Sequence, residues 1–236
     1  MRLDQALLQK QLVGSLQESQ SLILQGRVLV NEQPVTKAGF AVKDTDVLRV
    51  KPGKDWVSRG AEKLKPLLTQ FGFEVRGRKF FDIGSSHGGF TQVLLQAGAE
   101  KVVCVDVAYG FLHPLLRSDE RVIVKERTNI CDMAVEDLPL VPDAFVMDVS
   151  FIHPMKVLRH LKTLLEHCEG IVLFKPQFAA ARSELEKGII KETAIAGVHH
   201  DFQTQLAEIN IEVVKYADSP VKGRKGNQET LYWLRW

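Results

Sequence analysis

The chain has 236 residues, 45% hydrophobic and 25% charged, which fits one or two globular domains and excludes disordered, collagen-like and coiled-coil proteins. No apolar run reaches the roughly 18 residues of a membrane helix, and no signal-like segment opens the chain, so we expect a cytoplasmic protein with no membrane partner. The net charge is only +2, but residues 1–54 hold 8 Lys and Arg against 5 Asp and Glu, which favours a polyanionic partner.

The first sixty residues contain a clear helix start. Ser15 and Glu18 have the spacing of a capping box. Leu16, Ile23 and Leu24 then recur at helical spacing and form one apolar face. This segment is predicted to be an amphipathic helix.

Short elements surround that helix. Gly26 is predicted to end it, and a shorter helix is expected over residues 3–10. Strands are expected at 27–30 and 47–50, with a turn at 31–32 after the first of them. The order predicts a small α+β unit of two helices and a small sheet.

The run Leu-Ile-Leu-Gln-Gly-Arg-Val-Leu-Val-Asn at 22–31 resembles the α-L RNA-binding module first known from a ribosomal small-subunit protein. The resemblance implies that residues 1–54 form an RNA-binding module whose two helices present basic side chains to RNA. This chain departs from that pattern where the second helix starts, because Leu16 and Gln20 stand at positions that are usually basic.

A linker is expected at about residues 51–58, since Pro52 and Gly53 interrupt regular structure between two lysines. Basic side chains gather around this linker and again late in the chain, a pattern that suits contacts with phosphate groups. The candidate RNA-binding residues are Lys51, Lys54, Arg59, Lys222, Arg224 and Lys225.

Beyond the linker, helical and strand patterns alternate, starting with a helix from about Arg59 to Phe71. This alternation predicts that residues 59–236 form an α/β domain with a doubly wound, mainly parallel, seven-stranded Rossmann-like sheet. The expected strands are 79–83, 102–106, 122–124, 144–148, 170–175, 211–216 and 230–235, and further helices are expected at 90–97, 154–167 and 196–208.

Three cysteines, Cys104, Cys131 and Cys168, lie 27 and 37 residues apart. An odd number at these spacings matches neither a disulfide framework nor a zinc site. We expect them to be reduced, buried and structural, and we expect no metal.

The first strand of this domain runs into a glycine-rich turn that opens a helix, a placement typical of a nucleotide site. Ser86 stands where a dinucleotide-binding turn has its second glycine, which disfavours NAD. Asp106, which closes the next strand, lies at the distance expected for a carboxylate that binds ribose hydroxyls. The pattern favours S-adenosylmethionine, with candidate contacts at Asp82, Gly84, Ser85, Ser86, Gly88, Gly89, Phe90, Thr91 and Asp106.

Four charged residues distant in sequence are expected to converge at the same edge of the sheet. Lys63 precedes the first strand, Asp148 and Lys175 close two others, and Glu229 opens the last. If the last strand is antiparallel, its start lies beside the carboxyl ends of the others, and all four residues face the cofactor crevice.

Several longer motifs follow one another along the chain, at residues 57–64, 88–91, 126–129, 148–152, 174–178 and 226–229. In sequence and order they resemble those of the TlyA family. These proteins, often labelled haemolysins, join the α-L module to an FtsJ-like methyltransferase domain, and characterised relatives methylate ribose 2′-hydroxyls of ribosomal RNA. The resemblance implies an S-adenosylmethionine-dependent enzyme with a catalytic tetrad at Lys63, Asp148, Lys175 and Glu229, and it adds Asn129 to the cofactor contacts.

The chain departs from the family pattern at positions beside the cofactor or its loop. These positions are His87, Gln92, Ala108, Phe111 and Ala179. None of them belongs to the tetrad.

The chemistry favours an electrostatic role for Lys175, which we expect to lie nearest the ribose hydroxyl, with the two carboxylates holding the ammonium groups. General-base action by Lys175 is the less favoured variant.

A non-catalytic RNA-binding protein that keeps the fold is the alternative function. A pore-forming haemolysin is disfavoured because the sequence offers no membrane element. The sequence does not identify the RNA, the nucleotide or the oligomeric state.

Overall fold

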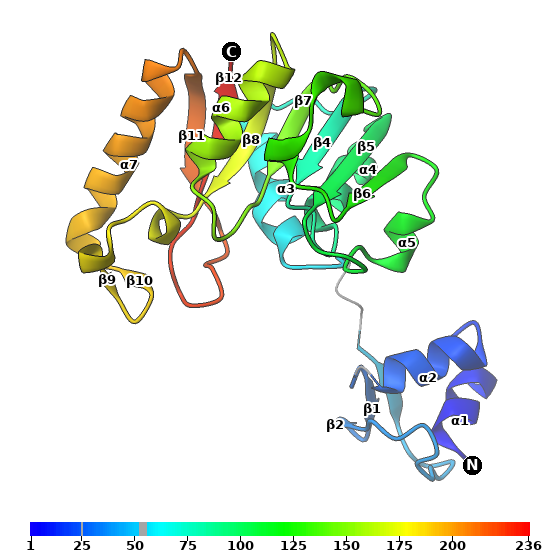
Figure 1. Cartoon of the computed structure of the whole chain (residues 1–236). Helices are drawn as coiled ribbons and strands as arrows, with labels where there is room; N and C mark the ends of the chain where they lie inside the picture. Colours follow the sequence, from blue (N-terminus) through cyan, green and yellow to red (C-terminus); the bar gives the residue numbers. More distant parts are fainter. Residues whose placement is uncertain (25, 52–55) are drawn as a thin grey trace. The chain divides into compact units, whose positions relative to one another are not determined.

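A computed structural model describes residues 1–24, 26–51 and 56–236 (Figure 1). The chain divides into two compact units, Met1–Asp55 and Trp56–Trp236. Of the RNA-binding candidates, Lys54 lies outside the described residues, as do positions 52–55 of the expected linker.

The first unit is a pair of short helices beside a three-stranded antiparallel sheet in the order β2-β1-β3. Apolar residues from both helices and the sheet, such as Leu3, Leu7, Ile23 and Val28, form its core. The elements are α1 Leu3–Gln9, α2 Leu16–Leu24, β1 Val28–Val30, β2 Gln33–Pro34 and β3 Leu48–Val50.

Local signals explain how α2 begins and how β1 turns into β2. The Ser15 hydroxyl accepts the Glu18 N–H at 3.1 Å, as a capping box requires, but the Glu18 carboxylate accepts the N–H of Gly14 rather than that of Ser15. The predicted box is therefore half formed. Asn31 and Glu32 have φ values of 50° and 64°, which suits the tight hairpin turn expected there.

The second unit contains alternating strands and helices. The major elements are α3 Gly60–Phe71, β4 Lys79–Ile83, α4 Gly89–Gln96, β5 Lys101–Asp106, α5 Pro114–Arg117, β6 Val122–Glu126, β7 Ala144–Met147, α6 Pro154–Leu164, β8 Glu169–Phe174, α7 Glu192–Glu208, β11 Glu212–Asp218 and β12 Thr230–Arg235. A small hairpin of β9 Leu185–Glu186 and β10 Ile189–Ile190 precedes α7.

The seven-stranded sheet has the order β11-β12-β8-β7-β4-β5-β6. The strands β8, β7, β4, β5 and β6 run parallel, while β12 is antiparallel to both of its neighbours. Thr230 pairs with Phe174, so the start of β12 lies beside the end of β8. The predicted doubly wound, mainly parallel sheet is confirmed, and the last strand is antiparallel.

Helices cover both faces of this sheet (Figure 1). On one face, α6 and α7 contribute residues such as Leu158 and Phe202 to a core that includes Phe81. On the other, α3 and α4 contribute Leu64 and Leu94 to a core that includes Phe80. Consecutive strand residues thus point to opposite cores, as expected of a sheet buried on both sides.

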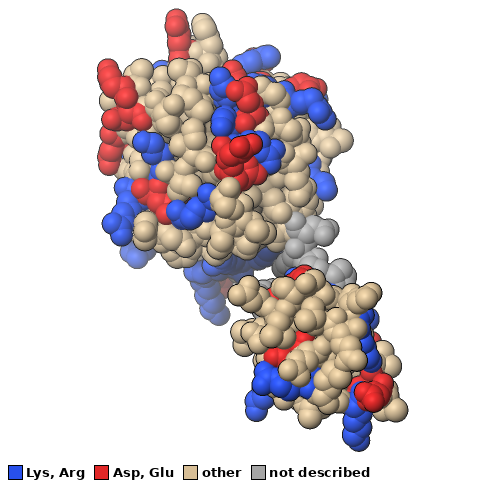
Figure 2. Space-filling model, turned by 90° about the vertical axis from the view of Figure 1, so that its right-hand side faces the viewer, with Lys and Arg blue, Asp and Glu red and all other residues tan. Residues whose placement is uncertain are grey.

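Two of the cysteines, Cys104 and Cys168, are buried, whereas Cys131 is only partly buried; all three are free. The expectation of burial is therefore wrong for Cys131. On the face shown in Figure 2, Lys and Arg side chains are interspersed with Asp and Glu, in keeping with the small net charge.

Candidate active site

The candidate site residues of the second unit gather where the parallel strands end and β12 begins. The turn after β4 carries the glycine-rich motif, and Asp106 is the last residue of β5. Asp148 and Lys175 each follow directly after the final residue of a strand, β7 and β8, and Glu229 directly precedes β12. The topology therefore brings these chain segments together at the end of the sheet where the parallel strands have their carboxyl termini.

The turn between β4 and α4 needs glycine because neighbouring backbone approaches it closely. Gly84 has a φ of 79°, and a Cβ there would lie 2.6 Å from the carbonyl oxygen of Asp148. A Cβ on Gly89 would collide with the hydroxyl of Ser58, beside the start of α3. Gly84 thus lets the turn pack against the backbone of Asp148, and Gly89 lets it pack against the start of α3, the helix that carries Lys63.

Asp82 holds this turn from inside the core. Its Oδ2 accepts the backbone N–H and the hydroxyl of Thr91, at 2.9 and 2.6 Å. Its Oδ1 is buried without a hydrogen-bond partner among the described residues. Burial raises the pKa of this carboxyl to about 7, because desolvation disfavours the charged form.

Asp106 ties the end of β5 to the turn. Its Oδ2 accepts the N–H of Ser86 at 2.7 Å, and its Oδ1 accepts the N–H of Ala108 at 2.8 Å. Ser86 is exposed and has a φ of 48°, unusual for a residue with a side chain. Asn129, in contrast, caps a short 3₁₀ turn by accepting the N–H of Cys131.

The remaining turn residues differ in how they meet solvent. Ser85, Gly88, Gly89, Phe90 and Thr91 are buried. Gly84, Asp106 and Asn129 are half-buried, and Ser86 is exposed. The surface available to a ligand is therefore formed by the exposed and half-buried residues, while the buried residues shape the turn from the protein interior.

Lys63 and Glu229 form a buried ion pair between α3 and the residue before β12. The Lys63 Nζ lies 2.5 Å from the Glu229 Oε2, and the two side chains are 11% and 4% exposed. A buried charge requires such a partner, because removal from water costs several kcal/mol per ion. The sequence separation of 166 residues shows that only the tertiary fold creates this pair.

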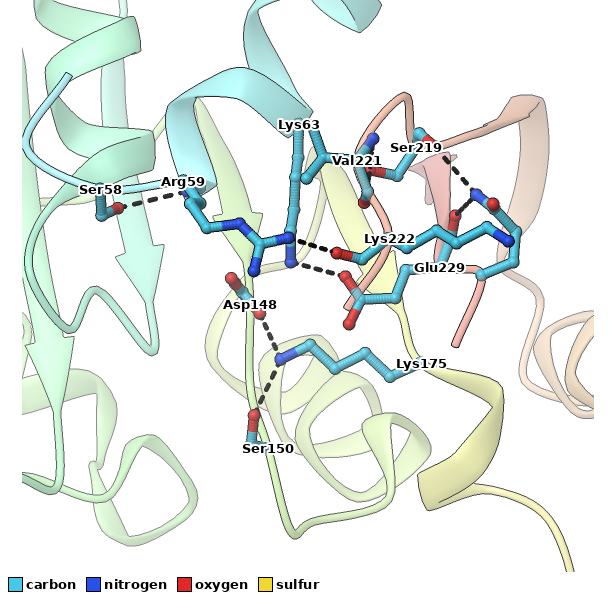
Figure 3. A network of polar contacts seen from close by, with 12 residues as sticks. Ser58, Arg59, Lys63, Asp148, Ser150, Lys175, Ser219, Val221, Lys222 and Glu229 are labelled. Atoms are coloured by element: carbon cyan, nitrogen blue, oxygen red, sulfur yellow. Dashed lines mark hydrogen bonds and ion pairs between the residues drawn. The ribbon is translucent and has the colours of Figure 1, made fainter. Parts of the chain in front are cut away.

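Lys175 and Asp148 form the second ion pair. The Lys175 Nζ lies 2.5 Å from the Asp148 Oδ1, and it also donates to the Ser150 hydroxyl at 2.8 Å. Figure 3 shows the two lysines and two carboxylates facing one another, with Ser150 at the far end of the group. The structure thus brings together all four residues of the predicted tetrad.

The basic candidates of the second unit also lie close to this group. Arg59, next to α3, donates from its guanidinium to the backbone carbonyl of Lys222 at 2.5 Å (Figure 3). Lys222, Arg224 and Lys225 are exposed on the loop that ends at Glu229. Lys51 is an exposed residue of the first unit, directly after β3.

Two of the positions that depart from the family pattern contact one another. The rings of His87 and Phe111 meet edge to face, with centroids 5.5 Å apart. Gln92 accepts the N–H of Val57 and so ties the start of the second unit to α4.

Sequence reasoning did not single out Ser150, which holds the ammonium of Lys175, or Asn227, which is buried beside the tetrad. Both lie within motifs that carry the family resemblance, so their position next to Asp148 and Glu229 was the available signal. Phe151, the next residue after Ser150, is 92% exposed and has a φ of 65°.

Within the described ranges, no three or more His, Cys, Asp or Glu side chains are grouped so that they could hold a metal ion. Over the same residues, no helix has the length and apolar character needed to cross a membrane.

Comparison with protein families gives a match for each unit. Residues 56–236 match the FtsJ-like methyltransferase family, and residues 1–48 match the S4 domain. The first match covers the seven-stranded sheet and every residue of the tetrad.

Individual relatives match over nearly the whole chain. The chain is 38% identical to the 16S/23S rRNA (cytidine-2′-O)-methyltransferase TlyA of Mycobacterium tuberculosis, over 99% of this chain and 89% of that protein. It is 36% identical to hemolysin A of Brachyspira hyodysenteriae, over 98% of each chain. A solved structure of a candidate hemolysin from Streptococcus thermophilus covers 100% of this chain and 88% of its own, with 32% identity and a TM-score of 0.75.

Proposed function

The chain belongs to the TlyA family of haemolysin-like ribosomal RNA methyltransferases, and we propose that Lys63, Asp148, Lys175 and Glu229 are its catalytic residues. It is an enzyme that methylates ribose 2′-hydroxyls of ribosomal RNA, the activity named for its TlyA relative. The observation that carries the catalytic proposal is the pair of ion pairs, Lys63 with Glu229 and Lys175 with Asp148, at the sheet edge beside the glycine turn.

The reaction requires a ribose hydroxyl to become a nucleophile. A hydroxyl is a weak nucleophile until its proton is leaving, so the enzyme must favour the developing alkoxide. The Lys175 ammonium is suited to this task because it is only 11% exposed and is fixed in direction by Asp148 and Ser150. A preorganised positive charge lowers the free energy of the alkoxide without having to reorient during the reaction.

General-base action by Lys175 is the less favoured variant. A lysine acts as a base near pH 7 only when its pKa falls well below the usual value of about 10.4. Here a carboxylate lies 2.5 Å from each of the two lysines, so each lysine side chain is engaged in an ion pair. We therefore assign Lys175 an electrostatic role, with Asp148 and Glu229 holding the two ammonium groups.

We assign S-adenosylmethionine as the cofactor, which supplies an activated methyl group on a sulfonium. The residues present fit this group: Gly84 leaves no room for a side chain, Ser86 is exposed, and the Asp106 carboxylate stands beside them. Asp106 would hold the ribose hydroxyls, and Asn129 would add a further contact to the cofactor. Asp82, Ser85, Gly88, Gly89, Phe90 and Thr91 would shape the turn that carries these contacts.

For the RNA, we propose that residues 1–54 act as an RNA-binding module, joined by a linker at about 51–58 to the methyltransferase domain at 59–236. The match of residues 1–48 to the S4 domain supports this assignment. In the second unit, Arg59, Lys222, Arg224 and Lys225 would contact phosphates next to the tetrad, and Lys51 and Lys54 would add contacts near the linker. A ribosomal RNA substrate supports the proposal that the protein acts in the cytoplasm.

The proposed function is tested by mapping 2′-O-methyl groups on ribosomal RNA from cells with and without the gene. We expect at least one methylated ribose to disappear with the gene and to return with the wild-type gene. A Lys175→Ala gene should not restore it, which links the modification to the tetrad. An unchanged methylation map would contradict the enzymatic role and favour the non-catalytic RNA-binding alternative.

A further inference from the structure

Residues 219–229, here called the strap, connect β11 to β12 and present two different faces. The outer face carries three exposed cations, Lys222, Arg224 and Lys225. The inner face carries Asn227 and Glu229, each only 3% exposed. The segment that offers charges to solvent is therefore the same one that delivers a buried carboxylate to the tetrad.

The strap is held at two points. The guanidinium of Arg59 donates to the carbonyl of Lys222. The carboxamide of Asn227 accepts the N–H of Ile190 and donates to the carbonyl of Gly188, both at 2.9 Å, and so ties the strap to the β9–β10 hairpin. These contacts fix the turn that lies between them.

Gly223 lies in that turn and packs directly on the tetrad. Its N–H donates to the carbonyl of Asn227 at 2.9 Å. A Cβ on Gly223 would lie 2.6 Å from the Oε1 of Glu229 and 3.2 Å from its carboxyl carbon, whereas real Cβ atoms essentially never approach within 3.0 Å. The φ of Gly223 lies outside the left-handed region, so its backbone would accept alanine.

The other oxygen of the same carboxylate pairs with Lys63. Glu229 Oε2 lies 2.5 Å from the Lys63 Nζ, while Oε1 faces Gly223. Any shift of Oε1 away from position 223 turns the whole carboxylate and moves Oε2 relative to the ammonium. The contact at Gly223 therefore controls the geometry of this ion pair.

We propose that Gly223 is a positioning residue of the catalytic centre, which holds the Glu229 carboxylate on Lys63 by leaving no side chain between the strap and that carboxylate. The proposal rests on the proposed function of the tetrad. It assigns the strap a second role in addition to its cationic outer face: it sets the position of half of the catalytic charges.

The direct test is Gly223→Ala. We expect kcat for ribosomal RNA methylation to fall by about 10²-fold, the loss expected when a catalytic group is displaced by roughly 1 Å. The Kd values for S-adenosylmethionine and for RNA should stay within about two-fold of wild type, because the glycine turn and the exposed cations are unchanged. Losses in binding that match the loss in kcat would overturn the proposal.

Two matched glycine variants serve as controls. Gly226→Ala changes the same strap, at a glycine with a φ of 96° and no atom within 4 Å of an added Cβ. Gly197→Ala lies in α7, also with nothing within 4 Å, and should leave activity unchanged. Because alanine at a φ of 96° is strained, Gly226→Ala measures the cost of disturbing the strap without touching Glu229. A kcat loss in Gly226→Ala equal to that in Gly223→Ala would assign the loss to general disturbance of the strap and overturn the proposal.

A second readout does not depend on methyl transfer. Acetic anhydride acylates the neutral amine of lysine, with release of acetate and a proton. The rate at which it modifies Lys63 in the free protein, followed by mass spectrometry, therefore reports how well the ion pair with Glu229 protects this side chain. We expect this rate to rise several-fold in Gly223→Ala and to remain at the wild-type value in Gly226→Ala. A wild-type labelling rate in Gly223→Ala would overturn the proposal, whether or not the protein methylates RNA. A wild-type protein that methylates no RNA would count against the proposed function and not against the positioning role of Gly223.

The double variant Gly223→Ala with Glu229→Gln separates positioning from general damage. If Gly223 acts through Glu229, alanine at 223 should add at most about a two-fold loss in kcat in the Glu229→Gln background. If the two losses multiply, Gly223 acts on the protein as a whole, and the positioning role is refuted.

Discussion

The glycine-rich turn after β4 and the proposed catalytic tetrad are held together by different interactions. The cofactor turn relies on backbone hydrogen bonds and close glycine contacts, with Asp106 accepting the N–H groups of Ser86 and Ala108. The tetrad relies on two ion pairs, Lys63 with Glu229 and Lys175 with Asp148, whose members come from four separate segments.

If the turn and the tetrad act as proposed, this difference predicts that cofactor binding and methyl transfer can be separated by mutation. Most hydrogen bonds of the turn are local, from Asp82 within it and from Asp106 at the end of β5, although Gly84 and Gly89 also pack against the Asp148 carbonyl and Ser58. The tetrad exists only when α3, β7, β8 and β12 are all in place. Changes in the turn should therefore affect cofactor affinity, and changes in the tetrad should affect the rate of methyl transfer.

The largest expected effect is that of Lys175→Ala. It removes the ammonium that we place nearest the hydroxyl, and methyl transfer should fall by about 10²- to 10³-fold, as when one preorganised electrostatic group is deleted. Calorimetry should show an unchanged Kd for S-adenosylmethionine. Lys175→Arg should restore activity only in part, because a planar guanidinium cannot place its charge where a compact ammonium lay. Wild-type methylation by Lys175→Ala would rule out the assignment of the tetrad.

Asp106→Ala should have the opposite profile. Loss of a hydrogen bond to a charged group costs roughly 1.5 to 3 kcal/mol, so the Kd for S-adenosylmethionine should rise by roughly 10- to 150-fold. At saturating cofactor, the rate should recover most of its wild-type value because both ion pairs remain. An unchanged Kd in calorimetry would show that Asp106 serves the turn alone.

Asp82 provides a test through pH. Its pKa is about 7 in the folded protein and near 3.8 when exposed, so between pH 4 and 7 the folded state keeps a proton that the unfolded state releases. Folding stability therefore falls as pH rises through this window, at about 1.4 kcal/mol per pH unit at most. In urea unfolding of cofactor-free protein, wild type should lose stability relative to Asp82→Asn from pH 4 to 7 and no further above it. Parallel pH profiles for the two proteins would show that Asp82 is ionised throughout.

The smallest effect is expected on the outer face of the strap. If Lys222, Arg224 and Lys225 contact phosphates, their joint replacement by Gln should flatten the dependence of RNA affinity on salt. Each lost contact should reduce the slope by about 0.7 to 0.9 log units per log unit of salt. The Kd for cofactor should not change. A slope equal to that of wild type would identify these residues as solvated surface.

The fold could be predicted from the sequence where patterns are strong. The strands Lys79–Ile83 and Thr230–Arg235 have both ends as predicted, since buried apolar runs with sharp boundaries define them. Helix α7 begins four residues earlier than expected, at Glu192, because its first turns carry few buried residues. The β9–β10 hairpin and α5 were missed; at two to four residues each, they are too short to show periodicity.

The convergence of the four charged residues could be predicted from the sequence, but their pairing could not. Which lysine meets which carboxylate depends on strand order, since β12 lies beside β8 and its start reaches toward α3. The contact of Gly223 with Glu229 was equally hidden, because sequence does not show which glycine of a loop faces inward. Local signals predict the cofactor turn, whereas tertiary structure decides the arrangement of charges.

The position of β12 within the sheet also constrains the order in which the domain assembles. Strand β12 follows β11 in the chain but lies between β11 and β8, so β11 at the sheet edge cannot join before β12 arrives. During synthesis, the nascent domain therefore exposes the edge of β8 and lacks Glu229 until residues 229–235 emerge. A ribosome-bound chain stalled before that point would hold the glycine turn but lack one member of the proposed tetrad, and its open β8 edge would be available for pairing with other chains.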